Sequence, residues 1–375
     1  MYPKVTKLLK GEFEMTRKKL LILLGSVCLA LMMVAMACAG PAPTTPAPTT
    51  PAPTTPAPSP TAEVYKWRFQ SAAVAAMTEW QFGPLRDSLH EMSNGRIELE
   101  LYATDVLVPD VELPDSLSEG VLDMAQSYAC RHADILDVGN IAFGLAFTWA
   151  SGDDCEVVGQ LLGLDDLLAE AYAELGVKFI NQELETEYYI LSTKPIKTIE
   201  DLAKIKMRAT ASNAPWLADL GVAAMYIPAA ELYTSLSRGI VDGVLYGGAV
   251  DYSDMGLFEI AKYVVKPSVL YPTKGEYIMC LDLWNSLPGD IQAIVTAACK
   301  VNSRWIYNEF QRREWICLAD AVKNQGVTVT WLSAEDQAKV MNAAKVVWEE
   351  EAAKSPRAAR GMEIVKDWLR TTGRL

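Results

Sequence analysis

The residue best suited to binding chemistry is Arg208, which lies in a short segment of alternating apolar and polar residues, 205–209. This alternation predicts a half-buried β-strand with Arg208 near its end. A guanidinium group offers a planar pair of donors that matches a carboxylate, and it stays charged when partly desolvated. Arg208 is therefore suited to bind an anionic ligand. From this segment alone, however, an interdomain ion pair to a glutamate is the favoured interpretation.

Three further polar residues lie at the ends of predicted strands. Gln70 and Ser71 end the strand that begins at Tyr65, and Tyr128 follows the strand 122–127. The carboxyl ends of strands in open α/β sheets are where such folds bind ligands. These residues are candidates for the same site, although an internal structural role accounts for each of them equally well.

Catalytic chemistry is not indicated by any motif. The chain has only two histidines, His90 on a predicted amphipathic helix and His132 in a polar loop. His90 and Glu91 begin like a zinc-protease helix, but Asn94 stands where the second histidine belongs. The sequence also lacks G-x-S-x-G, G-K-[ST] and G-x-G-x-x-G. We therefore expect a protein that is not an enzyme and has no cofactor, with a secreted enzyme as the weakest alternative.

The elements that position Arg208 alternate between helix and strand. Helices are predicted at 198–204, 215–220 and 229–238, and strands at 205–209, 223–227 and 241–246. The same alternation opens the globular part, with strands at 65–70, 96–102 and 122–127 and helices at 78–92 and 113–119. Strands that alternate with helices favour a mostly parallel sheet covered by helices.

Five short motifs occur in order within and just beyond these elements. They are Glu200-Asp201-Leu202, Lys206-Met207-Arg208, Pro228-x-x-Glu231-x-Tyr233-x-x-Leu236, Gly239-x-Val241-Asp242-Gly243 and Ala261-Lys262-Tyr263. As a set, at this spacing, they resemble the solute-binding proteins of TRAP transporters, the four-carbon-dicarboxylate-receptor-like family. The resemblance extends from about Tyr65 to the C-terminus.

The resemblance implies a fold, a function and two site residues. It implies an α/β, two-lobed periplasmic-binding-protein-like fold with mostly parallel sheets, crossing hinge strands and long C-terminal helices. It implies a receptor that passes its ligand to TRAP membrane permease subunits, and a sensor protein signalling to a membrane partner is the alternative. Arg208 would form a bidentate salt bridge to a ligand carboxylate. Tyr246 would face the ligand, with a core tyrosine as the alternative.

Residues 246–262 are similar to the subgroup of this family that binds 2-oxo acids together with a metal ion. That subgroup has a metal-binding glutamate just before its aromatic residue, where this chain has Leu245. A leucine side chain offers no oxygen ligand to a hard cation. We therefore expect metal-free binding of a monocarboxylate or 2-oxo acid, and the nearby tyrosines would suit an apolar or aromatic tail.

The two lobes are expected to be discontinuous in sequence. Lobe I would comprise 64–187 with part of 255–375, and lobe II 188–254 with part of 265–335. A long helical run is predicted at 288–325, and Ser333 would cap a second one, which Pro356 interrupts; Thr198 is the predicted N-cap of the helix 198–204. The C-terminal helices, 334–375, would pack across both lobes. The chain is expected to cross between lobes at 188–192 and 256–264, so that the lobes close on ligand about a hinge.

The N-terminal segment 1–38 is typical of a secretory signal. Basic residues 17–19 precede an apolar stretch, 20–36, which ends in Ala35-Met36-Ala37-Cys38. This end resembles a lipobox, although Ala35 stands where leucine is favoured. We expect Cys38 to carry lipid and to hold the protein outside the cytoplasm, with an uncleaved anchor as the alternative.

Residues 39–63 are rich in proline and threonine, which predicts an extended tether; a remnant without a role is the alternative. The formal charge of −13 argues against nucleic-acid binding. If Cys28 leaves with the signal and Cys38 is acylated, the remaining cysteines are Cys130, Cys155, Cys280, Cys299 and Cys317. Their number is odd, so at least one thiol should be free.

Overall fold

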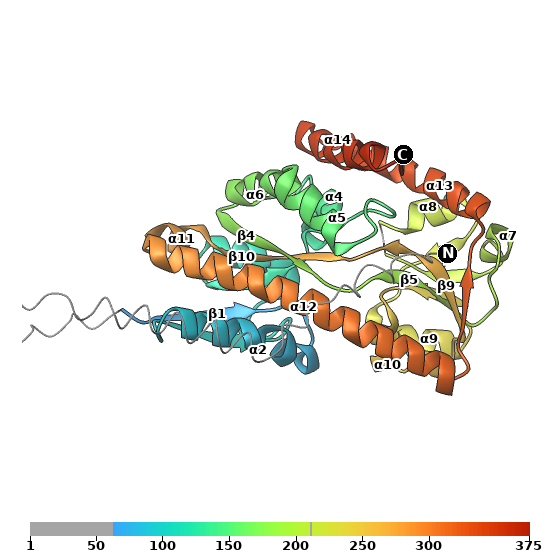
Figure 1. Ribbon diagram of the computed structural model, residues 1–375, viewed down its shortest axis with the longest axis horizontal. Helices are drawn as coiled ribbons and strands as arrows, with labels where there is room; N and C mark the ends of the chain where they lie inside the picture. The colour runs from blue at the N-terminus through green and yellow to red at the C-terminus, as the bar shows by residue number, and fades with distance from the viewer. Residues whose placement is uncertain (1–62, 211) are drawn as a thin grey trace, which may run out of the picture. The chain divides into compact units, whose positions relative to one another are not determined.

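The computed structural model describes residues 63–210 and 212–375. Their strands form two β-sheets, and helices pack against these sheets (Figure 1). The predicted signal 1–38, the acylation site Cys38 and nearly all of the tether 39–63 lie outside the described residues and stay predictions. None of the helices in the described ranges combines the length and apolar character that a membrane span requires.

The first sheet has the spatial strand order β2-β1-β3-β10-β4. Its strands are β1 (Tyr65–Gln70), β2 (Ile97–Tyr102), β3 (Met124–Ser127), β4 (Val177–Leu184) and β10 (Lys274–Cys280). Adjacent side chains of β10 point to opposite faces of this sheet. Tyr277 packs in the apolar cluster of α2 (Ala75–Met92) and α12 (Gly289–Asn324), whereas Ile278 packs with Tyr172 of α6 (Leu164–Glu174). Helices therefore cover both faces.

The second sheet has the order β11-β9-β5-β8-β6-β7. Its strands are β5 (Tyr188–Ser192), β6 (Lys206–Arg208), β7 (Ala223–Met225), β8 (Gly243–Leu245), β9 (Tyr263–Leu270) and β11 (Thr328–Trp331). Short helices connect several of them: α7 (Ile199–Leu202), α8 (Ala214–Asp219), α9 (Leu232–Ser237) and α10 (Ala249–Asp254). The Thr198 hydroxyl accepts a hydrogen bond from Asp201 N at 3.3 Å and so caps α7.

Both sheets are mixed. Of the strand pairs in the described residues, five are parallel and four are antiparallel. The antiparallel pairs all involve β5 or β10, the strands that the chain enters at its first two passages between the sheets. The predicted α/β class with two sheets is confirmed, and the parallel majority is narrow.

The chain passes between the sheets through two short segments, 185–187 and 271–273, which we call the crossings, and a third time through α12, which lies between β10 and β11. The two crossings are hydrogen-bonded to each other, from Glu185 N to Thr273 O (3.1 Å) and from Thr273 N to Thr186 O (2.7 Å). Our predicted crossings were wrong, because both 188–192 and 256–264 lie on the second-sheet side. Strands can be recognised in a sequence by their apolar residues. The crossings cannot, because each consists of three residues without a periodic pattern.

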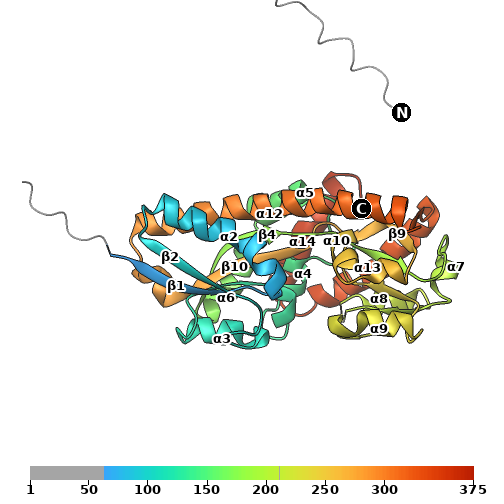
Figure 2. The same ribbon diagram turned by 90° about the horizontal axis from the view of Figure 1, so that it is seen from below.

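Helix α12 accompanies both sheets, as Figure 2 shows along its length. It packs against α2 and β4 on the first-sheet side and against α10 on the second-sheet side. The predicted helical run 288–325 matches it to within a residue at each end. This helix of 36 residues packs against elements of both sheets. It therefore links the two sheets in addition to the crossings.

Two more long helices end the chain. The Ser333 side chain caps α13 (Ala334–Ala352) by accepting a hydrogen bond from Asp336 N at 3.1 Å. Ser355 caps α14 (Pro356–Thr371), which starts at the predicted interruption because proline is tolerated in a first helical turn. Helix α13 packs on α8, and α14 packs on α6 and α4 (Gly139–Phe143).

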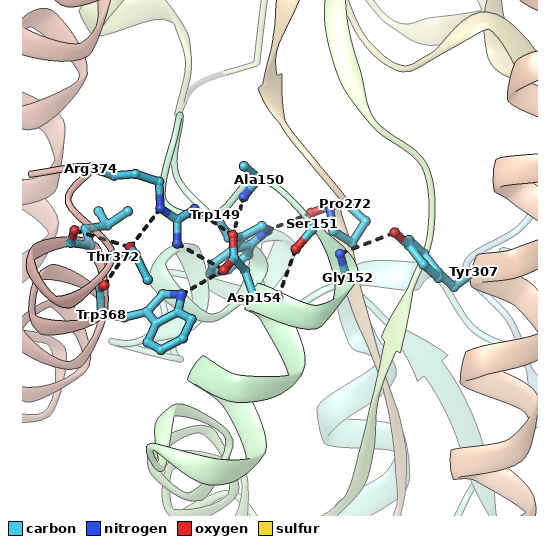
Figure 3. A network of polar contacts seen from close by, with 11 residues as sticks. Trp149, Ala150, Ser151, Gly152, Asp154, Pro272, Tyr307, Trp368, Thr372 and Arg374 are labelled. Carbon is cyan, nitrogen blue, oxygen red and sulfur yellow. Dashed lines mark hydrogen bonds and ion pairs between the residues drawn. The ribbon is translucent and has the colours of Figure 1, made fainter. Parts of the chain in front are cut away.

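Asp154 anchors the C-terminal segment (Figure 3). It lies in the first turn of a short helix, α5 (Gly152–Glu156). Both oxygens of the Asp154 carboxylate pair with Arg374, at 2.6 and 3.0 Å. Trp368 Nε1 donates to the same carboxylate at 2.9 Å, and Ala150 N donates at 3.1 Å. Several donors therefore converge on one acidic side chain.

The loop beside Asp154 also contacts a crossing and the long helix (Figure 3). Trp149 Nε1 donates to Pro272 O at 2.7 Å, and Gly152 N donates to the Tyr307 hydroxyl of α12 at 3.3 Å. Residues 149–154 thus connect the C-terminal segment to the place where the chain passes between the sheets.

Candidate ligand-binding site

The strand directions bring two sheet edges to the crossings. In the first sheet, β1, β3 and β4 run the same way, so the residues that follow them, Ser71, Tyr128 and Glu185, share one edge. In the second sheet, the ends of β6 and β8 lie beside the start of β5, so Arg208, Tyr246 and Tyr188 share another. We call these the first edge and the second edge. Because the crossings join them directly, the two edges adjoin.

Arg208 is buried on the second edge, with 3% of its surface exposed. Strand β6 is an inner strand between β7 and β8, and Arg208 pairs with Met225 on one side and Val244 on the other. Its Nε donates to Ile227 O at 3.0 Å, and its Nη1 donates to Leu245 O at 3.1 Å. These bonds fix the plane of the guanidinium group.

Two aromatic rings flank this guanidinium group. Its central carbon lies 5.0 Å from the ring centre of Tyr246 and 5.5 Å from that of Tyr226. Burial raises the pKa of Tyr246, and the negative charge of Asp251 adds to the rise. The structure thus brings the predicted residues Arg208 and Tyr246 together and adds Tyr226, which is largely exposed.

No carboxylate lies within ion-pair distance of Arg208 among the residues that the structure describes. The interdomain ion pair considered above is not formed there. A buried charge without a counter-charge is costly unless hydrogen bonds or a ligand stabilise it. The backbone carbonyls satisfy part of the guanidinium group, and its remaining donors can bind an anion.

The loop that carries Tyr246 is held by the hydroxyl of Tyr252. This hydroxyl donates to Tyr189 O at 2.6 Å and accepts from Tyr246 N and Gly247 N, at 3.3 and 3.4 Å. Glu314 of α12 accepts hydrogen bonds from Ala249 N at 2.7 Å and from the Tyr189 hydroxyl at 2.8 Å. The long helix therefore helps to position the Tyr246 loop.

The first edge presents Tyr128 and an acidic group. The Tyr128 hydroxyl donates to Glu185 Oε1 at 2.7 Å, and the Arg131 guanidinium group lies over the Tyr128 ring at 4.5 Å. Phe143 packs edge-on against Tyr128 and against Tyr188, with ring centres 6.1 and 6.4 Å apart. An aromatic row therefore leads from the first edge to the second.

Two carboxyl groups close to these edges have altered acidity. Burial raises the pKa of Glu185 to about 7, which the Tyr128 hydrogen bond partly offsets. Burial likewise raises the pKa of Asp251, to about 7. Asp251 accepts a hydrogen bond from Gly248 N at 3.0 Å, and this bond favours its charged form. Both groups change charge near neutral pH.

Gln70 and Ser71 lie on the first edge but are engaged internally. Gln70 is fully buried; its Oε1 accepts from Leu107 N and Val108 N, and its Nε2 donates to Val108 O. The Ser71 hydroxyl is buried within hydrogen-bonding distance of Thr78 and of backbone carbonyls. Both side chains hold neighbouring segments in place, which matches the structural alternative.

Residues 185–188 are the part of the site that sequence reasoning missed. Tyr188 was predicted only as the start of a segment that crosses between the lobes, and Glu185 was given no role. A signal was present, because Glu183, Glu185 and Glu187 make this short stretch unusually acidic for the end of a buried strand. Glu185 lies on the first edge because β4 runs in the same direction as β1 and β3. This direction cannot be inferred from a single sequence.

Other reactive groups remain apart from these edges. His132 Nε2 lies 3.0 Å from the Ser127 hydroxyl, and burial lowers the pKa of this histidine. No group of three or more histidine, cysteine and acidic residues in the described ranges could hold a metal ion. The Leu245 side chain is fully buried. The cysteines of the described residues are free thiols: Cys130, Cys155, Cys280, Cys299 and Cys317.

Two hollows lie elsewhere. A surface groove of about 340 Å³ runs between α2 and β2, lined by residues that include Arg86, His90 and Glu98. An apolar cavity of about 20 Å³ lies under Trp216, Val265 and Val340, too small for more than a water molecule. Neither contains a group as well suited to an anionic ligand as Arg208.

The sequence profile of the bacterial extracellular solute-binding proteins, family 7, matches residues 75–355. Among curated proteins, a monocarboxylate 2-oxoacid-binding periplasmic protein of Nostoc sp. is 23% identical over 234 residues. The match covers 59% of this chain and 61% of that relative.

Solved structures show the same fold. A TRAP periplasmic solute-binding protein of Rhodobacter sphaeroides, in an apo open structure, is 25% identical and has a TM-score of 0.73, over 83% of this chain and 99% of that one. One from Chromohalobacter salexigens with bound (S)-(+)-2-amino-1-propanol is 24% identical with a TM-score of 0.70, over 82% and 96% of the two chains. One from Bordetella bronchiseptica, with calcium and picolinate, is 20% identical with a TM-score of 0.70, over 82% and 95%.

Proposed function

This chain belongs to the bacterial extracellular solute-binding proteins, family 7, and on that premise we propose that it is the extracytoplasmic receptor of a TRAP-type transporter. It captures a small organic acid through Arg208 and delivers it to the membrane permease subunits. The observation that carries the proposal is a nearly fully buried arginine, at an edge between two sheets, with no acidic partner among the described residues.

The ligand class follows from the groups around Arg208. A carboxylate matches the remaining donors of the guanidinium group. Leu245 supplies no side-chain oxygen for a metal ion, so the carboxylate binds directly, as a monocarboxylate or a 2-oxo acid. The rings of Tyr246, Tyr226 and Tyr188 suit an apolar or aromatic tail. The Nostoc relative, whose name specifies 2-oxo acids, supports this class, whereas the Chromohalobacter structure with an amino alcohol shows how far ligands vary across the fold.

The proposal also includes attachment to a membrane through lipid on Cys38, with residues 39–63 as a tether between the lipid and the receptor. A receptor held in this way stays near its permease while it binds ligand. Mass spectrometry of the membrane fraction should find Cys38 as the modified N-terminal residue. A mature chain that begins elsewhere and is free in solution would contradict the anchor and leave the receptor function intact.

The experiment for the function is a thermal-shift screen of the purified protein against a library of organic acids. A ligand that binds only the folded state stabilises it by RT ln(1 + [L]/Kd), about 2.7 kcal/mol at 100 times Kd. We expect hits among monocarboxylates and 2-oxo acids, and the same hits should disappear in Arg208→Ala. The absence of any hit among these acids, or hits that Arg208→Ala retains, would reject the proposal.

A further inference from the structure

Glu185 is the acidic side chain that the proposed function leaves unexplained. It is 7% exposed, and it lies in the crossing between the sheets, where its backbone N–H is bonded to Thr273 O. Oε1 accepts the Tyr128 hydroxyl at 2.7 Å. Within the described residues, Oε2 accepts no hydrogen bond. A buried carboxylate normally satisfies both oxygens, so this one retains acceptor capacity.

The neighbouring cation does not use that capacity. Arg131 lies over the Tyr128 ring, and its Nη1 pairs with Asp110 at 2.6 Å. No hydrogen bond joins Arg131 to Glu185 in the part of the chain that the structure describes. The other charged groups that act on Glu185 are the carboxyl groups of Glu183 and Asp251, which repel it. A hydrogen-bond donor would therefore stabilise Glu185.

The crossing also approaches the second edge closely. A Cβ atom on Gly248, two residues after Tyr246, would lie only 2.7 Å from the Thr186 hydroxyl. That hydroxyl is buried and has no hydrogen-bond partner in the described residues. The charges of Glu185 and Arg208 both act on Tyr246. The site thus carries a cation at one end and, at the other, a carboxylate oxygen that no protein donor of the described residues reaches.

We propose that Glu185 determines the specificity of this site by accepting a hydrogen bond from a hydroxyl or ammonium group of the acid that Arg208 holds. The inference rests on the proposed function and narrows its ligand class to monocarboxylates that carry a hydrogen-bond donor, with 2-oxo acids as the weaker ligands. Hydroxy acids and amino acids satisfy both ends of the site. A 2-oxo acid or an unsubstituted acid brings at most a carbonyl oxygen to Glu185, and two acceptors repel each other.

The test uses matched acids on one carbon skeleton, in which a single carbon carries a hydroxyl, an ammonium, a carbonyl oxygen or only hydrogen. That carbon is placed in turn at C2, C3 and C4. Calorimetric titrations of the folded protein are made at pH 8, above the pKa of about 7 of Glu185, so that the carboxylate is charged. We expect the hydroxy or amino acid of one series to bind about tenfold or more tightly than its oxo counterpart.

Glu185→Gln replaces the acceptor with an amide of the same size that also donates. The ratio of affinities should then fall about tenfold, mainly because the oxo acid gains a donor. Glu183→Gln is the matched control, since it makes the same substitution in a fully enclosed neighbour two residues away. It should leave the ratio unchanged.

Three outcomes are decisive. If Glu185→Gln leaves the ratio unchanged while Arg208→Ala abolishes binding, the specificity proposal fails and the receptor function stands. If Arg208→Ala binds like the parent, the proposed function itself fails. If Glu185→Gln does not fold, the parent protein still decides, because equal affinity for the oxo, unsubstituted and donor-bearing acids overturns the proposal.

Discussion

Two regions next to the crossings treat their cations in opposite ways. In the Trp149 region, which we define as Trp149, Asp154, Asp165, Lys274 and Arg374, each cation has an acidic partner. Arg374 pairs with Asp154, and Lys274 Nζ pairs with Asp165 at 2.9 Å while lying 5.6 Å from the Trp149 ring. In the Arg208 region, which comprises Arg208, Tyr226 and Tyr246, the cation has backbone carbonyls and aromatic rings instead.

This difference between the two regions indicates that the paired cations stabilise the fold, whereas Arg208 is available for ligand binding. A buried ion pair with satisfied partners needs nothing from solution, and removal of one partner leaves an uncompensated charge in the folded protein. Among the described residues Arg208 has no such partner, so a bound anion would stabilise its buried guanidinium group. Substitutions in the Trp149 region should therefore change unfolding and spare binding, whereas substitutions in the Arg208 region should do the reverse.

The largest effect is expected for Lys274→Met. The side chains of Lys274 and Asp165 are only 3% and 9% exposed, so the variant leaves Asp165 charged and buried. Breaking such a pair costs about 3–5 kcal/mol of unfolding free energy. Denaturant unfolding measures the loss. Ligand affinity of the remaining folded protein should be unchanged.

A matched double variant sharpens this test. Lys274→Met combined with Asp165→Leu removes both charges and keeps the volume apolar, so most of the lost stability should return. If Lys274→Met instead weakens ligand binding without changing stability, the Trp149 region belongs to the site and the comparison is wrong.

The next effect is expected for Arg208→Ala. Hydrogen bonds to a charged group contribute roughly 1.5–3 kcal/mol each, so loss of a bidentate pair should weaken binding by about 100-fold or more. Arg208→Lys keeps the charge and loses the planar fork, so its affinity should fall between the two. Calorimetric titration with an acid identified in the screen measures both.

Melting curves provide the control for Arg208. Removing an unpaired buried cation should leave the melting temperature close to that of the parent. A variant that unfolds would reveal that Arg208 stabilises the sheet through Ile227 O and Leu245 O, and the comparison of the two regions would collapse.

A smaller effect is expected for Asp154→Asn. The side chains of Asp154 and Arg374 are 15% and 28% exposed, so water replaces part of the lost interaction. We expect a loss of about 1 kcal/mol, which lowers the melting temperature of a chain of this size by about 2 °C. Scanning calorimetry measures the shift. A large loss of affinity would show instead that the loop at 149–154 transmits its state to the site.

The sequence predicted the regular elements well where a local signal marks them. Thr198 and Ser333 have side chains that cap, and the strand 65–70 has strict alternation; all three appear where predicted. Helices α10 and α11 (Leu281–Ser286) were missed, although α8 and α9, which also have six residues each, were predicted. The crossings were misplaced because a strand's pattern does not say to which sheet it belongs.

For the candidate site, sequence reasoning found the cation and missed the acceptor. The rule that ligands bind at strand ends selected Tyr128 and Gln70 alike. It gives the edge of the sheet but not the direction of a side chain, and Gln70 turns inward to bond Leu107 and Val108. Glu185 follows a strand whose neighbour, β10, comes about 90 residues later in the chain, so its position depends on a non-local pairing.

The smallest effect is expected for Tyr246→Phe, because we predict that the ring of Tyr246 and not its hydroxyl contributes to binding. The ring centre lies 5.0 Å from the Arg208 guanidinium carbon, and in the described residues the hydroxyl makes no hydrogen bond to protein. A cation–π contact of this kind contributes roughly 0.5–2 kcal/mol, and phenylalanine retains it. Tyr246→Phe should therefore bind ligand within about threefold of the parent, whereas Tyr246→Ala should bind about tenfold more weakly. Calorimetric titration of both variants decides, because equal losses would identify the hydroxyl as the group that contacts the ligand.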